Sequence, residues 1–185
     1  VAGAERGLRQ ARRRIQGHWG DTTLVVATID HDGRVQVAWT GDSRAFLVRE
    51  GRQSWALHQM TRDHTEAVAR AAWQPVGVDD HAWFDRSGLA QRLTSHLRTG
   101  AIGTATVRLD EPDVRGLLLC TDGVTGSLRA DVIASILRQV SRHTGDPGQA
   151  VRELVEMAVT SSSSSGDNAA AVFLPVGPLP SPRIW

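Results

Sequence analysis

The stretch Leu117-Leu118-Leu119-Cys120-Thr121-Asp122-Gly123 decides the fold class that this sequence predicts. Three leucines and a cysteine in succession are typical of a strand that is buried on both faces. The apolar run ends in a carboxylate, Asp122, followed by a glycine. Residues 129–140 then have the helical spacing of apolar side chains, so we expect Gly123 to open a strand-to-helix connection and not a hairpin. The sequence therefore places Asp122 at the end of a buried strand.

The composition is that of an ordinary globular protein. The chain has 185 residues, of which 41% are hydrophobic and 22% are charged. No apolar run reaches the ~18 residues of a membrane span, and no charged-then-apolar leader opens the chain. The sequence has a single cysteine, Cys120, and so no second cysteine for a disulfide, and we expect a cytoplasmic protein. The formal net charge of +1 does not indicate a nucleic-acid partner.

Local patterns predict an α+β fold, with one domain over residues 1–176 and a flexible tail over residues 177–185. Apolar spacing and the N-cap pair Asp146-Pro147 predict helices over residues 4–16, 66–73, 129–142 and 147–159. Strand patterns cover residues 22–29, 34–40, 45–49, 55–58, 89–97 and 103–109, and residues 117–120 and 169–174 are predicted as buried strands. Short connections between the early strands favour antiparallel pairing.

Two segments break this periodicity. Residues 74–88 contain Trp83 and Phe84 without a regular pattern, and we expect a surface excursion there. The five serines at residues 161–165 are typical of a flexible connector. Neither segment predicts a separate domain.

Three aspartates share one placement, at the edge of an apolar strand beside a glycine or another small residue: Asp42, Asp122 and Asp167. Strand ends of one sheet can converge, and converging carboxylates repel one another unless a cation neutralises them. Oxygen ligands alone favour a hard ion such as Mg²⁺ or Mn²⁺. The alternative interpretation is three independent turn aspartates. The sequence shows no zinc-ligand spacing, nucleophile elbow or dinucleotide-binding glycine loop.

Five short motifs occur in one order along residues 20–176: Thr22-Thr23-Leu24-Val25, Thr40-Gly41-Asp42-Ser43-Arg44-Ala45, Thr61-Arg62-Asp63-His64-Thr65, Leu117 to Gly123, and Gly166-Asp167-Asn168. In this order and spacing they resemble the metal-dependent protein phosphatase family, the PPM or type 2C serine/threonine phosphatases. Each motif alone is unspecific, whereas the ordered set is specific. The resemblance implies an antiparallel β-sandwich flanked by helices, with a two-metal centre at one end.

The resemblance also implies roles for the three aspartates. Asp122 and Asp167 match the acids that hold the second metal. Asp42 matches, together with Asp122, the pair that binds a third, weaker metal in bacterial members. Mn²⁺ or Mg²⁺ would activate a water for direct hydrolysis of phosphoserine or phosphothreonine, so no catalytic side chain is expected. Residues 66–89 correspond to the family's variable flap beside the active site.

The resemblance is incomplete at its start. The family's first motifs are an arginine that grips phosphate and an Asp-Gly-x-Gly-Gly that bridges both metals, and nothing in residues 1–19 matches them. Without the bridging acid, Asp122 and Asp167 form a weak site, and without the early strands sheet edges are left open. We therefore expect the C-terminal two-thirds of a phosphatase domain, or a remnant, with weak or no activity alone. Asp21 and Gly126 also depart from the family pattern.

The favoured functional hypothesis is a bacterial signal-transduction hydrolase. Its partners would be phosphorylated proteins, among them a serine/threonine kinase or its targets, with no nucleic acid and no membrane. The alternative is a pseudophosphatase, which keeps the fold as a phosphoprotein-binding regulatory module. Phosphatases of anti-sigma-factor antagonists resemble the chain at residues 121–125, but the motifs at residues 41–44 and 63–65 favour the general branch. A structural β-sandwich with coincidental aspartates is the third interpretation.

Overall fold

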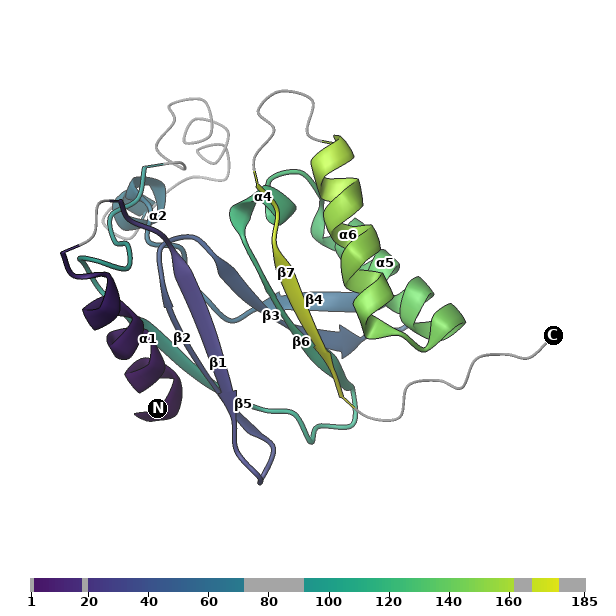
Figure 1. Ribbon diagram of the computed structural model, residues 1–185. Helices are drawn as coiled ribbons and strands as arrows, with labels where there is room; N and C mark the ends of the chain where they lie inside the picture. Colours follow the sequence, from purple (N-terminus) through teal and green to yellow (C-terminus); the bar gives the residue numbers. More distant parts are fainter. Residues whose placement is uncertain (1, 18–19, 72–91, 162–167, 177–185) are drawn as a thin grey trace. The chain divides into compact units, whose positions relative to one another are not determined.

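The computed structural model describes residues 2–17, 20–71, 92–161 and 168–176 (Figure 1). The chain divides into two compact units. The first unit comprises Val1–Asp30, Val35–Ser43 and Thr61–Thr106, and the second comprises His31–Arg34, Arg44–Met60 and Val107–Trp185. The single domain over residues 1–176 stays a prediction. The tail 177–185 and the excursion 74–88 lie outside the described residues.

The first unit contains helix α1 (Ala2–Ile15), helix α2 (Glu66–Ala71) and most of a three-stranded sheet. The strands are β1 (Leu24–Ile29), β2 (Arg34–Thr40) and β5 (Gly103–Arg108), in the order β1-β2-β5. β1 and β2 form the predicted antiparallel hairpin, with Leu24 opposite Thr40.

The apolar stripe of α1 packs against this sheet, because Ala4 and Leu8 are fully buried in one cluster with Ala38 and Leu97. The predicted helix over residues 4–16 is therefore confirmed, with its start two residues earlier.

The second unit contains a four-stranded sheet in the order β4-β3-β6-β7, and each neighbouring pair is antiparallel. Its strands are β3 (Arg44–Glu50), β4 (Trp55–Gln59), β6 (Val114–Cys120) and β7 (Ala171–Pro175). In the described part of the chain, β6 is followed by the helices α4 (Asp122–Thr125), α5 (Ala130–Thr144) and α6 (Pro147–Ser161). β2 and β3 are consecutive strands, yet they belong to different sheets.

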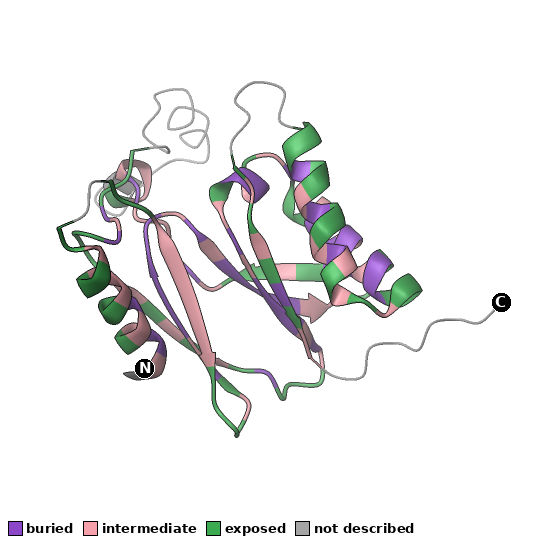
Figure 2. Ribbon diagram, viewed as in Figure 1, coloured by how far each residue is buried: buried purple, intermediate pink, exposed green. Residues whose placement is uncertain are grey.

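The core of the second unit lies between this sheet and helices α5 and α6. Leu118 and Phe173 from the strands are buried with Leu137 and Leu154 from the helices. Figure 2 shows buried residues along the inner faces of both helices and exposed residues on their outer faces. Because burial of each such side chain is worth about 1.5–3 kcal/mol, this core is the main stabilising element of the unit.

Helix α6 begins as its sequence predicts. The Asp146 carboxylate Oδ1 accepts a hydrogen bond from the Gly148 amide (2.8 Å), and Pro147 is the first helical residue. Asp146 therefore satisfies one of the free amides of the first turn. None of the helices in the described part of the chain has the length and apolar character that a membrane span requires.

Two predictions about strands are wrong. Residues 92–97 of the predicted strand 89–97 form only an isolated bridge between Leu93 and Thr65. The Ser95 hydroxyl instead accepts a hydrogen bond from the Ala101 amide (3.0 Å), which closes a turn, and residues 89–91 lie outside the described residues. The second error concerns residues 169–174, predicted to be buried. In β7 only Phe173 is buried, because the strand lies at a sheet edge.

Candidate functional site

Three of the five sequence motifs meet in the first unit. The hydroxyl groups of Thr23 and Ser43 are 2.8 Å apart and share a hydrogen bond. The His64 amide donates to the Gly41 carbonyl (2.9 Å), and the Gly41 amide donates to His64 Nδ1 (3.3 Å). These contacts join the start of β1, the end of β2 and the polar segment before α2, which are far apart in the sequence.

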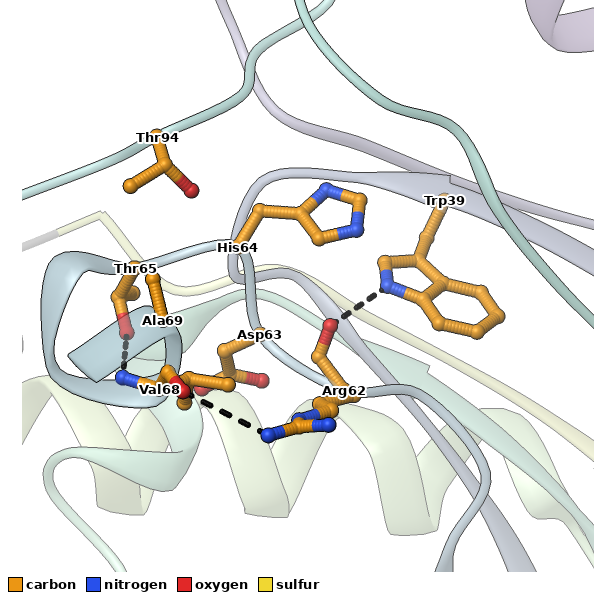
Figure 3. Close-up of a pocket in the computed structure, with 8 residues that line it drawn as sticks. All are labelled: Trp39, Arg62, Asp63, His64, Thr65, Val68, Ala69 and Thr94. Carbon is orange, nitrogen blue, oxygen red and sulfur yellow. Dashed lines mark hydrogen bonds between the residues drawn. The ribbon is translucent and has the colours of Figure 1, made fainter. Parts of the chain in front are cut away.

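A cavity of about 370 Å³ opens beside this meeting point (Figure 3). Its lining combines an aromatic ring, an imidazole, two opposite charges, hydroxyl groups and small apolar side chains: Trp39, Arg62, Asp63, His64, Thr65, Val68, Ala69 and Thr94. Trp39 Nε1 donates to the Arg62 carbonyl (2.8 Å), as Figure 3 shows. The cavity therefore offers both polar and apolar contacts to a bound group.

The imidazole of His64, which lines this cavity, has a shifted pKa. Burial lowers the pKa of the His64 imidazole below its ordinary value, and the nearby Asp63 carboxylate opposes this effect in part. The ring stacks on Trp39 with 6.2 Å between centroids and 25° between planes. His64 is therefore held neutral at neutral pH.

Asp42 follows directly on Gly41, whose backbone is left-handed (φ +97°). A Cβ atom at Gly41 would overlap the Thr23 side chain, lying 2.5 Å from its Cβ atom, so only glycine fits here. Asp42 itself is half-buried, and the neighbouring Ser43 is buried. The turn that carries Asp42 is therefore tightly packed.

In the second unit, the fourth motif lies against Asn168, the described residue of the fifth motif. Asp122 begins α4 two residues after β6 ends; its carboxylate is exposed, and Oδ1 accepts the Gly123 amide (3.0 Å). The Thr121 amide donates to the Ala170 carbonyl (3.0 Å). A Cβ atom at Gly123 would lie 2.5 Å from the Asn168 carbonyl oxygen. Because Gly123 has no side chain, the backbone of Asn168 can approach the Asp122 turn. Asn168 follows Asp167 directly in the sequence.

The convergence of Asp42, Asp122 and Asp167 stays a prediction. Asp167 lies outside the described residues, and Asp42 and Asp122 belong to different units. Among the described residues, no three His, Cys, Asp or Glu side chains are grouped closely enough to hold a metal ion. In the sequence, Asp63 and His64 contributed only to the family resemblance, and no pattern predicted that they line a cavity. No local pattern could have paired them with Trp39, which is distant in the sequence.

Known proteins support a phosphatase fold. The family description "Protein phosphatase 2C" matches residues 5–69. The chain is 28% identical over 170 residues to "Protein phosphatase 1K, mitochondrial" of Xenopus laevis, covering 84% of this chain and 43% of that protein. It is 26% identical over 147 residues to "Serine/threonine phosphatase stp" of Listeria monocytogenes, covering 80% of this chain and 53% of that protein.

Among solved structures, the chain is similar to the PPM Ser-Thr phosphatase MsPP from Mycobacterium smegmatis. That structure was determined in complex with cacodylate, and the match has a TM-score of 0.69 at 26% identity, over 94% of this chain and 72% of that one. The chain spans about half the length of the curated relatives it matches. The prediction of an α+β fold with antiparallel sheets and helices is confirmed.

The fold and the ordered motifs are therefore similar to those of protein phosphatases. More specifically, residues 5–69 match the type 2C protein phosphatase family, and the fold is similar to that of a PPM phosphatase. Proteins of this family depend on metal ions in general.

Proposed function

We propose that this chain forms part of a metal-dependent protein phosphatase that hydrolyses phosphoserine and phosphothreonine. One observation carries the proposal: an exposed carboxylate, Asp122, at the end of a buried strand, with the backbone of Asn168 packed onto the next residue, Gly123. The similarity to two proteins named as serine/threonine phosphatases supports the same reaction.

The donor atoms suit a hard divalent cation. Asp113 and Asp131 each pair with an arginine in the second unit, whereas the Asp122 carboxylate accepts a hydrogen bond from the Gly123 amide and is exposed. Carboxylate oxygens are the ligands that Mn²⁺ and Mg²⁺ prefer. Since the described residues provide no group of three such donors, we propose that Asp167 supplies a second carboxylate beside Asp122.

Each residue then has a stated role. Asp122 and Asp167 hold the metal, and Asp42 contributes to a further, weaker metal together with Asp122. A bound divalent cation would lower the pKa of a water and neutralise charge on the phosphoryl oxygens. Gly123 keeps the Asp122 turn close to the segment that follows Asp167. The choice of Mn²⁺ or Mg²⁺ as the ion is part of this proposal.

The substrate would be a phosphorylated protein, and a serine/threonine kinase or its targets would be the partners. We place the protein in the bacterial cytoplasm, a proposal that rests on the presence of a single cysteine, the buried Cys120, in the sequence. The sequence's alternative, a non-catalytic member of the fold, has less support, because the similar proteins carry the names of phosphatases.

The test is Mn²⁺-dependent release of phosphate from a phosphothreonine peptide by this chain, compared with Asp122→Ala. We expect weak or no release by this chain alone, and any release that occurs should require Mn²⁺ and disappear in Asp122→Ala. A matched control is Asp131→Ala, which removes another exposed carboxylate, one that pairs with Arg129 (2.7 Å). The control is expected to keep the rate of the unmodified chain.

Two outcomes would exclude catalysis by this polypeptide on its own. One is an equal rate in the unmodified chain and in Asp122→Ala, because the carboxylate would then hold no essential metal. The other is no phosphate release in either protein at any Mn²⁺ concentration, which would exclude catalysis by this polypeptide.

A further inference from the structure

His64 and Gly41 are joined by two hydrogen bonds that run in opposite directions. The backbone amide of His64 donates to the Gly41 carbonyl (2.9 Å), and the Gly41 amide donates to the imidazole Nδ1 (3.3 Å). Because Nδ1 accepts this hydrogen bond, a neutral His64 carries its own proton on Nε2. The side chain therefore takes the place of a backbone acceptor for an amide at the end of β2.

The imidazole of His64 is held in place by its surroundings. Its ring stacks on Trp39, whose Nε1 donates to the Arg62 carbonyl (2.8 Å). The His64 carbonyl accepts the Thr94 amide (2.8 Å), so the backbone is anchored as well. Burial keeps the pKa of the ring below its ordinary value, against the opposing effect of Asp63, so Nδ1 remains an acceptor at neutral pH.

The turn that follows Gly41 is held from its other side by Thr23. The Thr23 and Ser43 hydroxyls share a hydrogen bond (2.8 Å), and the Thr23 side chain fills the space where Gly41 lacks a Cβ atom. Asp42 thus lies between two residues, Gly41 and Ser43, that are each bonded to another part of the first unit. Residues held this way keep one conformation before any ligand binds, which lowers the entropic cost of binding.

We propose that His64 is a positioning residue, which presents the Asp42 carboxylate by holding the Gly41 amide through Nδ1. This role rests on the proposed function, in which Asp42 is a metal ligand. His64 itself does not touch the metal or the substrate. The positioning role requires two features of the side chain at position 64: a hydrogen-bond acceptor at the place of Nδ1 and a planar group against Trp39.

A pair of substitutions separates these two requirements. His64→Asn keeps an acceptor oxygen one bond from Cγ, as Nδ1 is, but loses the ring. His64→Phe keeps a ring against Trp39 but loses the acceptor. The first measurement is hydrogen exchange of the Gly41 amide by NMR. We expect exchange about five- to tenfold faster in His64→Phe, and within about twofold of the unmodified chain in His64→Asn.

The second measurement is a Mn²⁺ titration that follows paramagnetic broadening of the Asp42 and Ser43 amide signals. We expect His64→Phe to need a higher Mn²⁺ concentration for half-maximal broadening than the unmodified chain. His64→Asn should need the same Mn²⁺ concentration as the unmodified chain. Equal melting temperatures of the two variants would show that the difference is not a general loss of folding.

Two results would overturn the positioning role. Unchanged Gly41 exchange in His64→Phe would mean that Nδ1 does not hold the turn. Faster exchange with an unchanged Mn²⁺ titration would mean that the turn does not present Asp42 to a metal. Both measurements are made without a phosphorylated substrate, so their outcome is separate from a failure of the phosphatase assay.

Discussion

The two places where the sequence motifs meet are built in different ways. In the first unit, side chains make the connections: Thr23 bonds to Ser43, and the His64 ring bonds to the Gly41 amide. In the second unit, the Asp122 turn is held mainly through backbone, by the Thr121–Ala170 bond and by close approach of Asn168 to Gly123. Asp42 is half-buried and Asp122 is exposed.

This difference teaches where each cluster is vulnerable. A cluster made by side chains depends on residue identity at several positions, whereas a cluster made by backbone depends on strand pairing and on one glycine. An exposed carboxylate that contributes little to folding is also the better candidate for a role in binding.

The largest effect is expected for Gly41→Ala in the first cluster. The left-handed backbone and the overlap with Thr23 both disfavour a Cβ atom, so the free energy of unfolding should fall by about 3 kcal/mol, as measured in urea. Gly145→Ala is the control, since Gly145 is also left-handed (φ +67°) but has open space around its Cβ position. Equal losses in both variants would contradict the packing argument.

A somewhat smaller effect is expected for Gly123→Ala in the second cluster. The new Cβ atom would lie 2.5 Å from a backbone oxygen of Asn168, which cannot turn away as a side chain can. We expect a loss of about 2 kcal/mol in the same measurement. Gly7→Ala in helix α1 serves as the control, because its Cβ atom would make only an ordinary 3.7 Å contact with Val26 and alanine favours a helix. A neutral Gly123→Ala would refute the close approach.

The side-chain bond of the first cluster can be isolated by a double-mutant cycle of Thr23→Val and Ser43→Ala. Each single change leaves one partner of the bond without the other, at a cost of about 1 kcal/mol in unfolding free energy. The double variant should lose less than the sum of the two single losses. Strict additivity would show that the two hydroxyls are not coupled.

The pH dependence of stability gives a smaller effect. Burial, opposed in part by Asp63, lowers the pKa of folded His64, so the unfolded chain binds a proton more readily. The contribution of neutral His64 to the free energy of unfolding is complete above pH ~6.5, the ordinary pKa of histidine. This contribution is lost as the pH falls toward the lowered pKa of the folded state. The difference in unfolding free energy between the unmodified chain and His64→Asn should decrease over that window. A difference independent of pH would contradict a neutral, buried His64.

The smallest effect on stability is expected for Asp122→Asn. The side chain is exposed, so the unfolding free energy should change by no more than about 0.5 kcal/mol. Thermal unfolding monitored by circular dichroism provides the measurement. A loss comparable to that of Gly123→Ala would mean that Asp122 stabilises the fold and would weaken its assignment to metal binding.

Local signals predicted most of the secondary structure. The period-two pattern of residues 34–40 gives β2 at its observed bounds, and Asp146-Pro147 marks the start of α6. The apolar run 117–120 lies within β6. These signals work because each depends on neighbours in the chain, through alternation, helical spacing or capping.

Non-local relationships were not predictable. An apolar run such as residues 171–175 gives no sign that its strand lies at a sheet edge, which is why Val172 is 63% exposed. The pairing of His64 with Gly41 joins segments that are separated by two strands, and no local pattern encodes it. The same limit applies to the three aspartates, whose order was predicted but whose meeting point depends on the tertiary fold.

The central claim, a metal site at the Asp122 turn, is tested most directly by a Mn²⁺ titration that follows the Gly123 and Asn168 amide signals by NMR. We expect low concentrations of Mn²⁺ to broaden both signals in the unmodified chain, and much higher concentrations to be needed in Asp122→Asn. Broadening that is absent, or that is the same in both proteins, would contradict the claim.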